Sequence, residues 1–143
     1  EVIEELADIL DREHKLDSRA EYVAKVYERE ATMSTYCGSE VAIPHAISSA
    51  VKVPAVCFGR SEELYWDSAD EGVRFVFLLA MPEEDHDATH IDIMSAISIC
   101  ALDPETREMW LKATTAEQIL VPLRRAVAAA DPDDSPSVGV TKI

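Results

Sequence analysis

Glycine, cysteine and long apolar runs are all scarce in this sequence, and each shortage excludes a class of protein. Only four of the 143 residues are glycine, while 48% are apolar. This composition excludes a fibrous or low-complexity chain and favours one globular domain with a proper core. No apolar stretch reaches the length that crosses a bilayer, and we expect no signal peptide. We therefore expect a cytoplasmic domain that does not itself insert into a membrane.

Positive charge is also in short supply. Lysine and arginine together number 13 against 28 aspartates and glutamates, a formal net charge of −15. A surface of this sign repels the phosphate backbone, so we expect no nucleic-acid partner. A partner protein with a basic patch remains possible.

The three cysteines lack the CxxC spacing of metal and redox motifs. A disulfide framework and a structural zinc site are therefore not expected. Cys57 and Cys100 lie in apolar segments and are predicted to be small core residues. Cys37 lies in a turn near His45 and is either an ordinary loop thiol or a reactive one.

Hydrophobic periodicity predicts helices and strands in the first half of the chain. Residues 2–10 carry an amphipathic stripe, and a capping-box pattern opens a second helix over residues 18–31. A short strand is predicted at 41–43. The runs 51–58 and 73–81 are rich in β-branched and aromatic residues. The second is apolar on both faces, which is typical of a central strand covered by helices.

The second half is predicted to be helical. Residues 89–102 are apolar nearly all round, which indicates a buried helix, and Asp103-Pro104 opens another that runs to Leu111. Thr115 begins a further helical region. Pro122 is expected to divide that region into a short turn and a separate helix ending at about Ala130.

Helices interleaved with apolar strands predict a single-domain α/β fold, with a mixed β-sheet covered by helices on both faces. The domain is expected to span residues 1–130. Residues 131–143 form an acidic, proline-containing linker by composition, and its final "GVTKI" resembles the start of another strand.

Four histidines are candidates for chemistry. His14 and His86 lie in polar, acidic loops and are expected to be solvated. His45 and His90 lie at the edges of strongly apolar elements. Residues 89–92 approximate a capping box, which places His90 in the first turn of its helix. The helix dipole there disfavours imidazolium and attracts a phosphoryl group, although an ordinary helix-start histidine is the alternative.

His45 follows Pro44 at the end of a short apolar run. Pro44 stiffens the backbone and keeps Ile43 extended, while small residues leave room around the imidazole. With a reference pKa of about 6.5, such a ring is largely neutral and can act as a nucleophile. The alternative is a partly buried imidazole hydrogen-bonded to a backbone carbonyl.

The spacing His86-x3-His90-x-Asp92, with His45 as a third imidazole, superficially resembles that of metal ligands on a helix. His86 falls in the loop before the predicted helix and so does not share a face with His90. We expect neither a metal nor a cofactor.

The stretch "REATMSTYCGSEVAIPHA" resembles the active-site segment of the fructose/mannitol-type IIA domains (EIIA type 2) of the bacterial phosphoenolpyruvate-dependent sugar phosphotransferase system. "VRFVFLLAMP" is similar to the central strand of that family, "THIDIMSAISICALDPE" to its second histidine-bearing helix and "LKATTAEQI" to its closing segment. The likeness runs from about Val2 to Ala130. The residues that carry the active-site likeness are Arg29-Glu30, Ser34-Thr35, Gly38 and Val41 to His45. Relatives often have a second glycine where this chain has Ser39 or Glu40.

The resemblance implies a phosphotransferase in sugar uptake, with fructose as the expected sugar. His45 would accept a phosphoryl group from the carrier protein HPr and pass it to a cysteine of a IIB domain of the same permease. His90 would orient or stabilise phosphohistidine. Arg29 would balance phosphate charge, or else form an ordinary helix ion pair. Apolar neighbours such as Ile43 and Ile47 would form a shallow docking face.

Three alternatives remain. A nitrogen-type regulatory IIA uses the same histidine but signals by binding proteins according to its phosphorylation state. A regulatory domain of a transcriptional activator is the second, and a metal hydrolase the third. The terminal "TKI" resembles the first residues of a fructose-type IIB domain, which would place the domain in a permease chain tethered to the membrane.

Overall fold

The computed structural model describes residues 2–66, 72–83, 89–130 and 139–141, which form five helices and a six-stranded mixed sheet. The helices are α1 (Val2–Arg12), α2 (Arg19–Thr32), α3 (Thr89–Ala101), α4 (Pro104–Lys112) and α5 (Ala116–Ala130). The strands are β1 (Tyr36–Gly38), β2 (Val41–Ala42), β3 (His45–Ser48), β4 (Ala55–Leu64), β5 (Val73–Pro82) and β6 (Gly139–Thr141).

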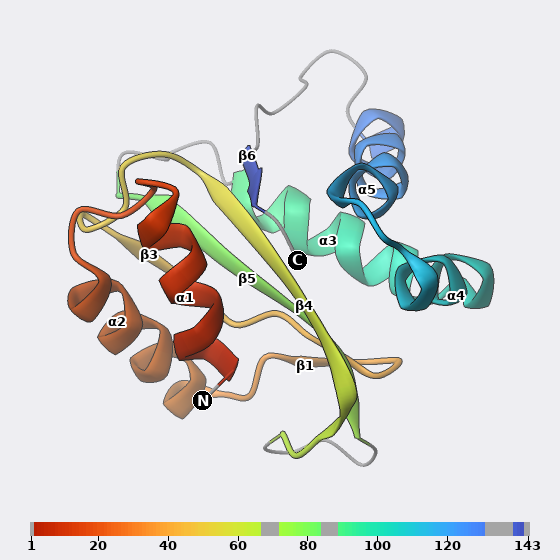
Figure 1. Ribbon diagram of the computed structural model, residues 1–143, viewed down its shortest axis with the longest axis horizontal. Helices are drawn as coiled ribbons and strands as arrows, with labels where there is room; N and C mark the ends of the chain where they lie inside the picture. Colours follow the sequence, from red (N-terminus) through yellow and green to blue (C-terminus); the bar gives the residue numbers. More distant parts are fainter. Residues whose placement is uncertain (1, 67–71, 84–88, 131–138, 142–143) are drawn as a thin grey trace.

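The sheet is built around β5 (Figure 1). β2 and β3 follow each other along one edge of β5 and run parallel to it, whereas β4 runs antiparallel along the other edge. β6 adds parallel to β4, and β1 folds back antiparallel on β2. β4 begins only after Pro54, which has no backbone donor, and extends further than the sequence predicted.

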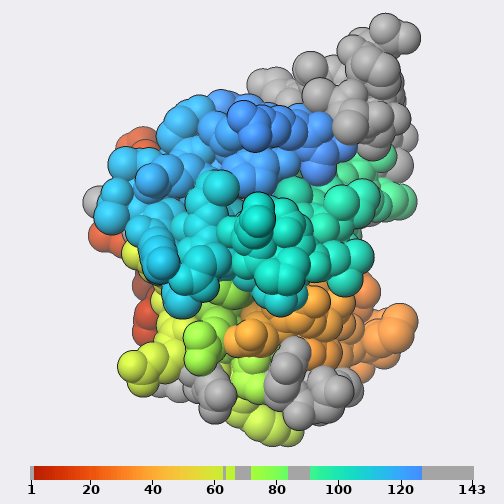
Figure 2. Space-filling view, turned by 90° about the vertical axis from the view of Figure 1, so that its right-hand side faces the viewer, coloured from red at the N-terminus to blue at the C-terminus, as the bar shows by residue number. Residues whose placement is uncertain are grey.

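Helices cover both faces of this sheet, as expected. α1 and α2 pack on one face and α3, α4 and α5 on the other (Figure 1). The side chains of β5 alternate between the two cores: Val76 and Leu78 join the first, and Phe77 and Leu79 the second. This explains why the sequence of β5 is apolar at both its odd and its even positions. In Figure 2, α3, α4 and α5 form one continuous layer over the second face.

Capping residues set the helix starts. The hydroxyl of Ser18 accepts from the Glu21 amide at 3.3 Å, and the carboxylate of Asp103 accepts from the Glu105 amide at 3.2 Å, with Pro104 in the first turn. These satisfy amides that have no partner within the helix. Both starts were predicted from sequence.

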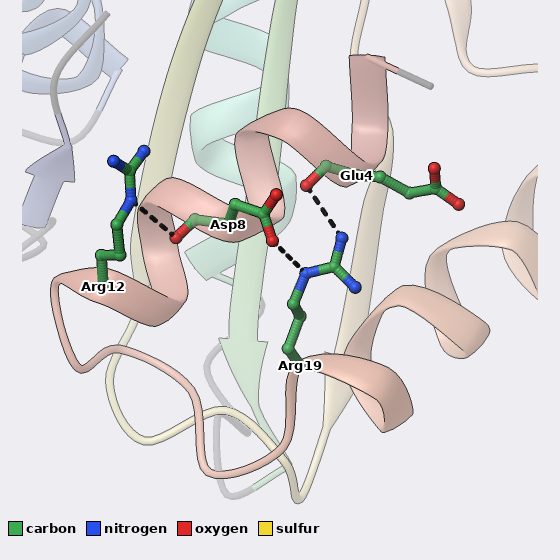
Figure 3. Close-up of polar contacts among 4 residues, drawn as sticks. All are labelled: Glu4, Asp8, Arg12 and Arg19. Atoms are coloured by element: carbon green, nitrogen blue, oxygen red, sulfur yellow. Dashed lines mark hydrogen bonds and ion pairs between the residues drawn. The ribbon is translucent and has the colours of Figure 1, made fainter.

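Arg19 joins the two helices of the first layer (Figure 3). Its Nε pairs with a carboxylate oxygen of Asp8, and its Nη2 donates to the carbonyl of Glu4 at 3.2 Å. Arg12 Nε donates to the carbonyl of Asp8 at 3.4 Å. Because these groups are exposed, the contacts orient α1 against α2 more than they stabilise the fold.

Two expectations about the helical layer were wrong. α5 continues through Pro122 without a break, because Ile119 and Leu123 on either side of the proline are both buried in the second core. Their packing outweighs the hydrogen bond that proline removes. α3 is not buried all round either, since Ile99 is 58% exposed.

The β1–β2 hairpin turns through left-handed backbone. Gly38, Ser39 and Glu40 have φ angles of 89°, 54° and 66°, and Gly38 pairs with Val41. Positive φ at both central residues defines a type I′ turn, which glycine and asparagine favour over serine and glutamate. The Glu40 carbonyl accepts from the amides of Arg74 and Phe75, at 2.9 and 3.1 Å, and so anchors the turn to β5.

The C-terminal strand start was also predicted correctly, because β6 pairs with Ala55–Cys57 of β4. Residues 131–138 of the predicted linker lie outside the described part of the chain, so the domain boundary at residue 130 stays a prediction. None of the described helices is long and apolar enough to cross a membrane.

Candidate functional site

His45 is the first residue of β3, directly after the proline that separates β2 from β3. It lies opposite Leu79 in the parallel ladder with β5, and the Leu79 amide donates to the Pro44 carbonyl at 3.0 Å. Both strands on either side of Pro44 pair with β5. The central strand therefore holds the backbone of His45 rigidly.

The imidazole of His45 has a defined orientation. Its Nδ1 lies 2.8 Å from the carbonyl oxygen of Ile43, and a carbonyl oxygen can only accept a hydrogen bond. In the neutral ring Nδ1 therefore carries the proton, and the lone pair is on Nε2. The residue is only 8% exposed. The sequence analysis expected an open, accessible ring, but His45 is largely buried and hydrogen-bonded to a backbone carbonyl. Its role as a nucleophile stays a prediction.

His45 nevertheless lines an open pocket of about 440 Å³ between α2 and β3. α2 contributes polar and charged groups to its wall, and β3 contributes His45 and two apolar neighbours. Ile47 lies at the rim and is 42% exposed, as a docking face requires. Ile43 does not contribute, because it is 2% exposed and packs in the second core. The lining residues are Lys25, Glu28, Arg29, Thr32, His45, Ala46 and Ile47.

Arg29 lines this pocket too, and its role in balancing phosphate charge stays a prediction. Its Nη1 donates to the carbonyl of Met33, just beyond the end of α2, at 2.7 Å. That carbonyl is one of the acceptors that a helix end leaves without an internal partner. The bond holds the guanidinium in place beside the pocket. The adjacent Glu30 is engaged elsewhere, with Thr35.

A chain of hydrogen bonds leads from Glu30 to the imidazole. The Glu30 carboxylate accepts from both the amide, at 3.2 Å, and the hydroxyl of Thr35. The Thr35 carbonyl accepts from the Ile43 amide at 3.0 Å, and the Ile43 carbonyl binds His45 Nδ1. Glu30 and Thr35 of the sequence motif thus hold the backbone segment to which the imidazole is bonded.

The other three histidines differ in position. His14 lies in the turn after α1, exposed and with a φ of 59°, as expected of a solvated loop residue. His90 lies in the first turn of α3, as predicted, and its role stays a prediction. His86 is outside the described residues. Within the described ranges no cluster of three or more His, Cys, Asp or Glu side chains could hold a metal ion.

The cysteines are poor nucleophiles. Cys57 and Cys100 are buried, as predicted; burial raises the pKa of the Cys57 thiol to about 12 and also raises the pKa of Cys100. Cys37 is an exposed residue, but its sulfur lies 3.4 Å from the Val41 carbonyl. Desolvation raises its pKa, and a hydrogen bond with Ser98 offsets this in part. A reactive Cys37 thiolate is therefore not favoured.

A second open pocket is lined by Arg60 and Arg74, but both guanidinium groups contact other groups of the protein. Arg60 Nη1 donates to the carbonyls of Trp110 and Leu111 at 2.8 and 3.1 Å. Arg74 Nε lies 2.9 Å from a carboxylate oxygen of Glu40, close enough for an ion pair but without the alignment of a hydrogen bond. Of these two pockets, the first is the one that combines a histidine with basic side chains.

Comparison with known proteins is consistent with this site. The sequence profile of the family described as "Phosphoenolpyruvate-dependent sugar phosphotransferase system, EIIA 2" matches residues 1–125. The chain belongs to this EIIA family. The resemblance drawn from the Pro-His signature is therefore confirmed, together with the fold it implied.

Individual EIIA relatives cover most of the chain. The fructose-specific EIIABC component of Bacillus subtilis is 34% identical over 83% of this chain, and the fructose-specific EIIA component of Haloferax volcanii is 30% identical over 82% of this chain and 77% of its own length. The nitrogen regulatory protein IIA-Ntr from Neisseria meningitidis has the same fold, with a TM-score of 0.74, 30% identity and coverage of 85% and 84% of the two chains. The chain spans only 19% of the length of the Bacillus subtilis EIIABC relative.

Sequence reasoning missed one residue that lines the pocket and one that supports it from the core. Lys25 lies one helical turn before Arg29 and lines the same pocket. Tyr22 is on the buried face of α2, and its hydroxyl donates a hydrogen bond to the Leu79 carbonyl of β5. The spacing of Tyr22, Lys25 and Arg29 on one helix was a signal that these side chains share a face, but without β3 in place nothing showed that the face meets His45.

Proposed function

We propose that His45 is the phosphoryl-accepting residue of a IIA domain of the sugar phosphotransferase system. Its Nε2 attacks the phosphorus of phospho-HPr, the phosphorus–nitrogen bond of HPr breaks, and the group is carried on His45. The thiolate of a IIB-domain cysteine then attacks the same phosphorus, and His45 returns to its neutral form. The observation that supports this most directly is the Nδ1 hydrogen bond to Ile43, because it leaves the lone pair on Nε2.

The proton balance suits a reversible carrier. The proton on Nδ1 stays on the ring through both steps, and the phosphorylated ring becomes cationic. The Ile43 carbonyl accepts a hydrogen bond from Nδ1–H throughout and stabilises the positive charge that develops on the ring. No general base is needed, because neutral imidazole attacks directly. The chemistry then depends on alignment and on cations near the phosphoryl oxygens.

The pocket offers Arg29 as one such cation, held by Met33. His90, in the first turn of α3, is the proposed second histidine that stabilises the phosphohistidine. The positive end of the helix dipole favours an anion near that turn.

The assignment to sugar uptake is supported by the fructose-specific names of two relatives. In the Bacillus subtilis protein the name EIIABC describes a single chain that includes A, B and C components. We propose that residues 1–130 form a IIA domain followed by a linker toward a IIB domain, although Gly139–Thr141 of the predicted linker pairs with β4 of the IIA sheet. Fructose is the proposed sugar.

A regulatory role is the second candidate. The likeness to the nitrogen regulatory protein of Neisseria meningitidis supports it at 30% identity. In that role the same phosphohistidine would control which protein the domain binds.

The decisive experiment combines the protein with phosphoenolpyruvate, enzyme I and HPr and measures its intact mass. Wild type should gain one acid-labile phosphoryl group. The His45→Ala variant should gain none, whereas the control His14→Ala, altered in an exposed turn, should be labelled like wild type. His90→Ala should still be labelled but transfer poorly. Labelling of His45→Ala would rule out the proposed nucleophile.

Transfer distinguishes the two candidate roles. A sugar-specific IIA should pass its label to the cysteine of a fructose-type IIB domain within seconds to minutes of mixing. A regulatory IIA should keep the label in the same mixture.

A further inference from the structure

We propose that Lys25 is a second cationic ligand of the phosphoryl group on His45, and that it exchanges its contact with Glu28 for that group. The inference rests on the proposed function and names one more residue of the same site. It follows from the position of Lys25, the weakness of its present ion pair and the engagement of Arg29.

The position of Lys25 is set by helix geometry. It precedes Arg29 by four residues on α2, so the two side chains are neighbours on one helix face. Both line the pocket that contains His45. The Lys25 side chain is 56% exposed, so its ammonium can move within the pocket without breaking core contacts. A lysine is well suited to this, because its charge sits on a flexible stem.

The ion pair that Lys25 makes now is weak. Its Nζ lies 3.6 Å from a carboxylate oxygen of Glu28, three residues along the helix, and both groups are exposed. Such pairs contribute little because water screens them. A phosphoryl group has up to two negative charges and three acceptor oxygens. It therefore competes effectively with one carboxylate for the ammonium.

The rest of the pocket makes a second cation useful. Arg29 is already bonded to the Met33 carbonyl. Glu28 lines the same pocket and repels an incoming phosphoryl group. The formal charge of the whole chain, −15, adds to that repulsion. Lys25 and Arg29 are the two basic side chains among the described residues that line this pocket.

The test uses the phosphorylated protein and ³¹P NMR to follow the last ionisation of the phosphoryl group with pH. A nearby cation favours the dianion and lowers the midpoint of this titration. We expect Lys25→Met to raise the midpoint by about half a pH unit, the size that corresponds to one partly exposed ion pair. Glu28→Gln should lower it, since the variant removes a repelling charge and releases Lys25.

The opposite signs separate the proposal from a merely structural pair. If Lys25 and Glu28 only stabilise α2, each variant breaks the same ion pair, and the titration midpoint should change in the same way in both. Lys52→Met is the matched control: it removes another exposed lysine, 45% exposed against 56% for Lys25, that is paired with Asp17 at 3.8 Å and lies outside the pocket. Its titration should match that of wild type.

The possible failures are distinguishable. If wild type gains no phosphoryl group from HPr, the proposed function is wrong, and this inference is overturned with it. If wild type is labelled on His45 but Lys25→Met titrates like wild type, only the role of Lys25 is overturned. A shift of the same sign in Lys25→Met and Glu28→Gln also overturns it.

Discussion

The hydroxyl of Tyr22 donates a 2.6 Å hydrogen bond to the carbonyl of Leu79, the residue directly opposite His45 in the sheet. Tyr22 is fully buried on the underside of α2, and Lys25 and Arg29 follow it on the same helix. A single buried bond thus connects the helix that carries the pocket's cations to the strand that holds the histidine. The distance between cations and imidazole depends on this contact.

We expect Tyr22→Phe to lower the free energy of unfolding by about 1 kcal/mol, because the buried hydrogen bond from the phenol to the Leu79 carbonyl is lost. Urea unfolding measures this effect. Tyr65→Phe, altered in a side chain that is 90% exposed, serves as the control and should be neutral. A Tyr22→Phe variant as stable as wild type would show that the carbonyl is satisfied in another way.

Tyr22 should also produce a measurable loss of stability at alkaline pH. Burial raises the pKa of its phenol well above the usual value in the folded state. The neutral form is favoured by folding, so this contribution is complete below about pH 10, where the unfolded chain also keeps its proton. Above that pH the unfolded state ionises first and stability falls. The decline between pH 10 and 11, measured by urea unfolding, should be smaller in Tyr22→Phe.

Thr35 should control the orientation of His45 through its bonds to Glu30 and Ile43. Thr35→Val keeps the size of the side chain but removes the hydroxyl, and we expect slower phosphorylation and a larger population of the other imidazole tautomer. Thr35→Ser restores the hydroxyl and should restore both. ¹⁵N NMR of the ring reports the tautomer, and mass spectrometry reports the rate. An unchanged tautomer in Thr35→Val would contradict this role.

The β1–β2 turn should become more stable with a glycine. Ser39 has a φ of 54°, which strains a residue with a Cβ, so Ser39→Gly should stabilise the protein by about 0.5 kcal/mol after the entropy of glycine is counted. Ser49→Gly is the control, because Ser49 is not among the residues with positive φ, and it should not stabilise. Thermal unfolding of the two variants distinguishes them. A destabilised Ser39→Gly would mean that the serine makes a contact worth more than the strain.

The three thiols should react in a fixed order. Cys37 is the exposed one and should be alkylated first, slowly and faster with rising pH, since its pKa is raised. Cys57 and Cys100 should resist the reagent until the protein unfolds. Counting modified thiols by mass spectrometry with and without urea tests this. Alkylation of Cys57 in the native state would contradict its burial.

Much of the architecture followed from local patterns. The cap at Ser18, the Asp103-Pro104 helix start and the two-faced apolar run of β5 each depend on neighbouring residues, so the sequence was enough to predict them. The Pro-His signature likewise identified His45 as the candidate nucleophile. These features were visible because their physical causes lie within a few positions along the chain.

Other features depended on packing between distant segments. Pro122 was expected to break a helix, but the burial of Ile119 and Leu123 holds α5 together. His45 was expected to be open, but the sheet and α2 leave it 8% exposed. In both cases the outcome depends on packing against residues far away in the sequence, which the local sequence pattern does not show.

By itself, the sequence identified the candidate nucleophile, His45, and most of the elements that surround it. Only the tertiary structure decided which nitrogen holds the lone pair and which cations share the pocket. The reason is geometric. The Ile43 carbonyl selects the tautomer of His45, and α2 lies beside β3 because both contact β5. Lys25 lies twenty residues before His45 in the sequence, and only the fold places the two in one pocket.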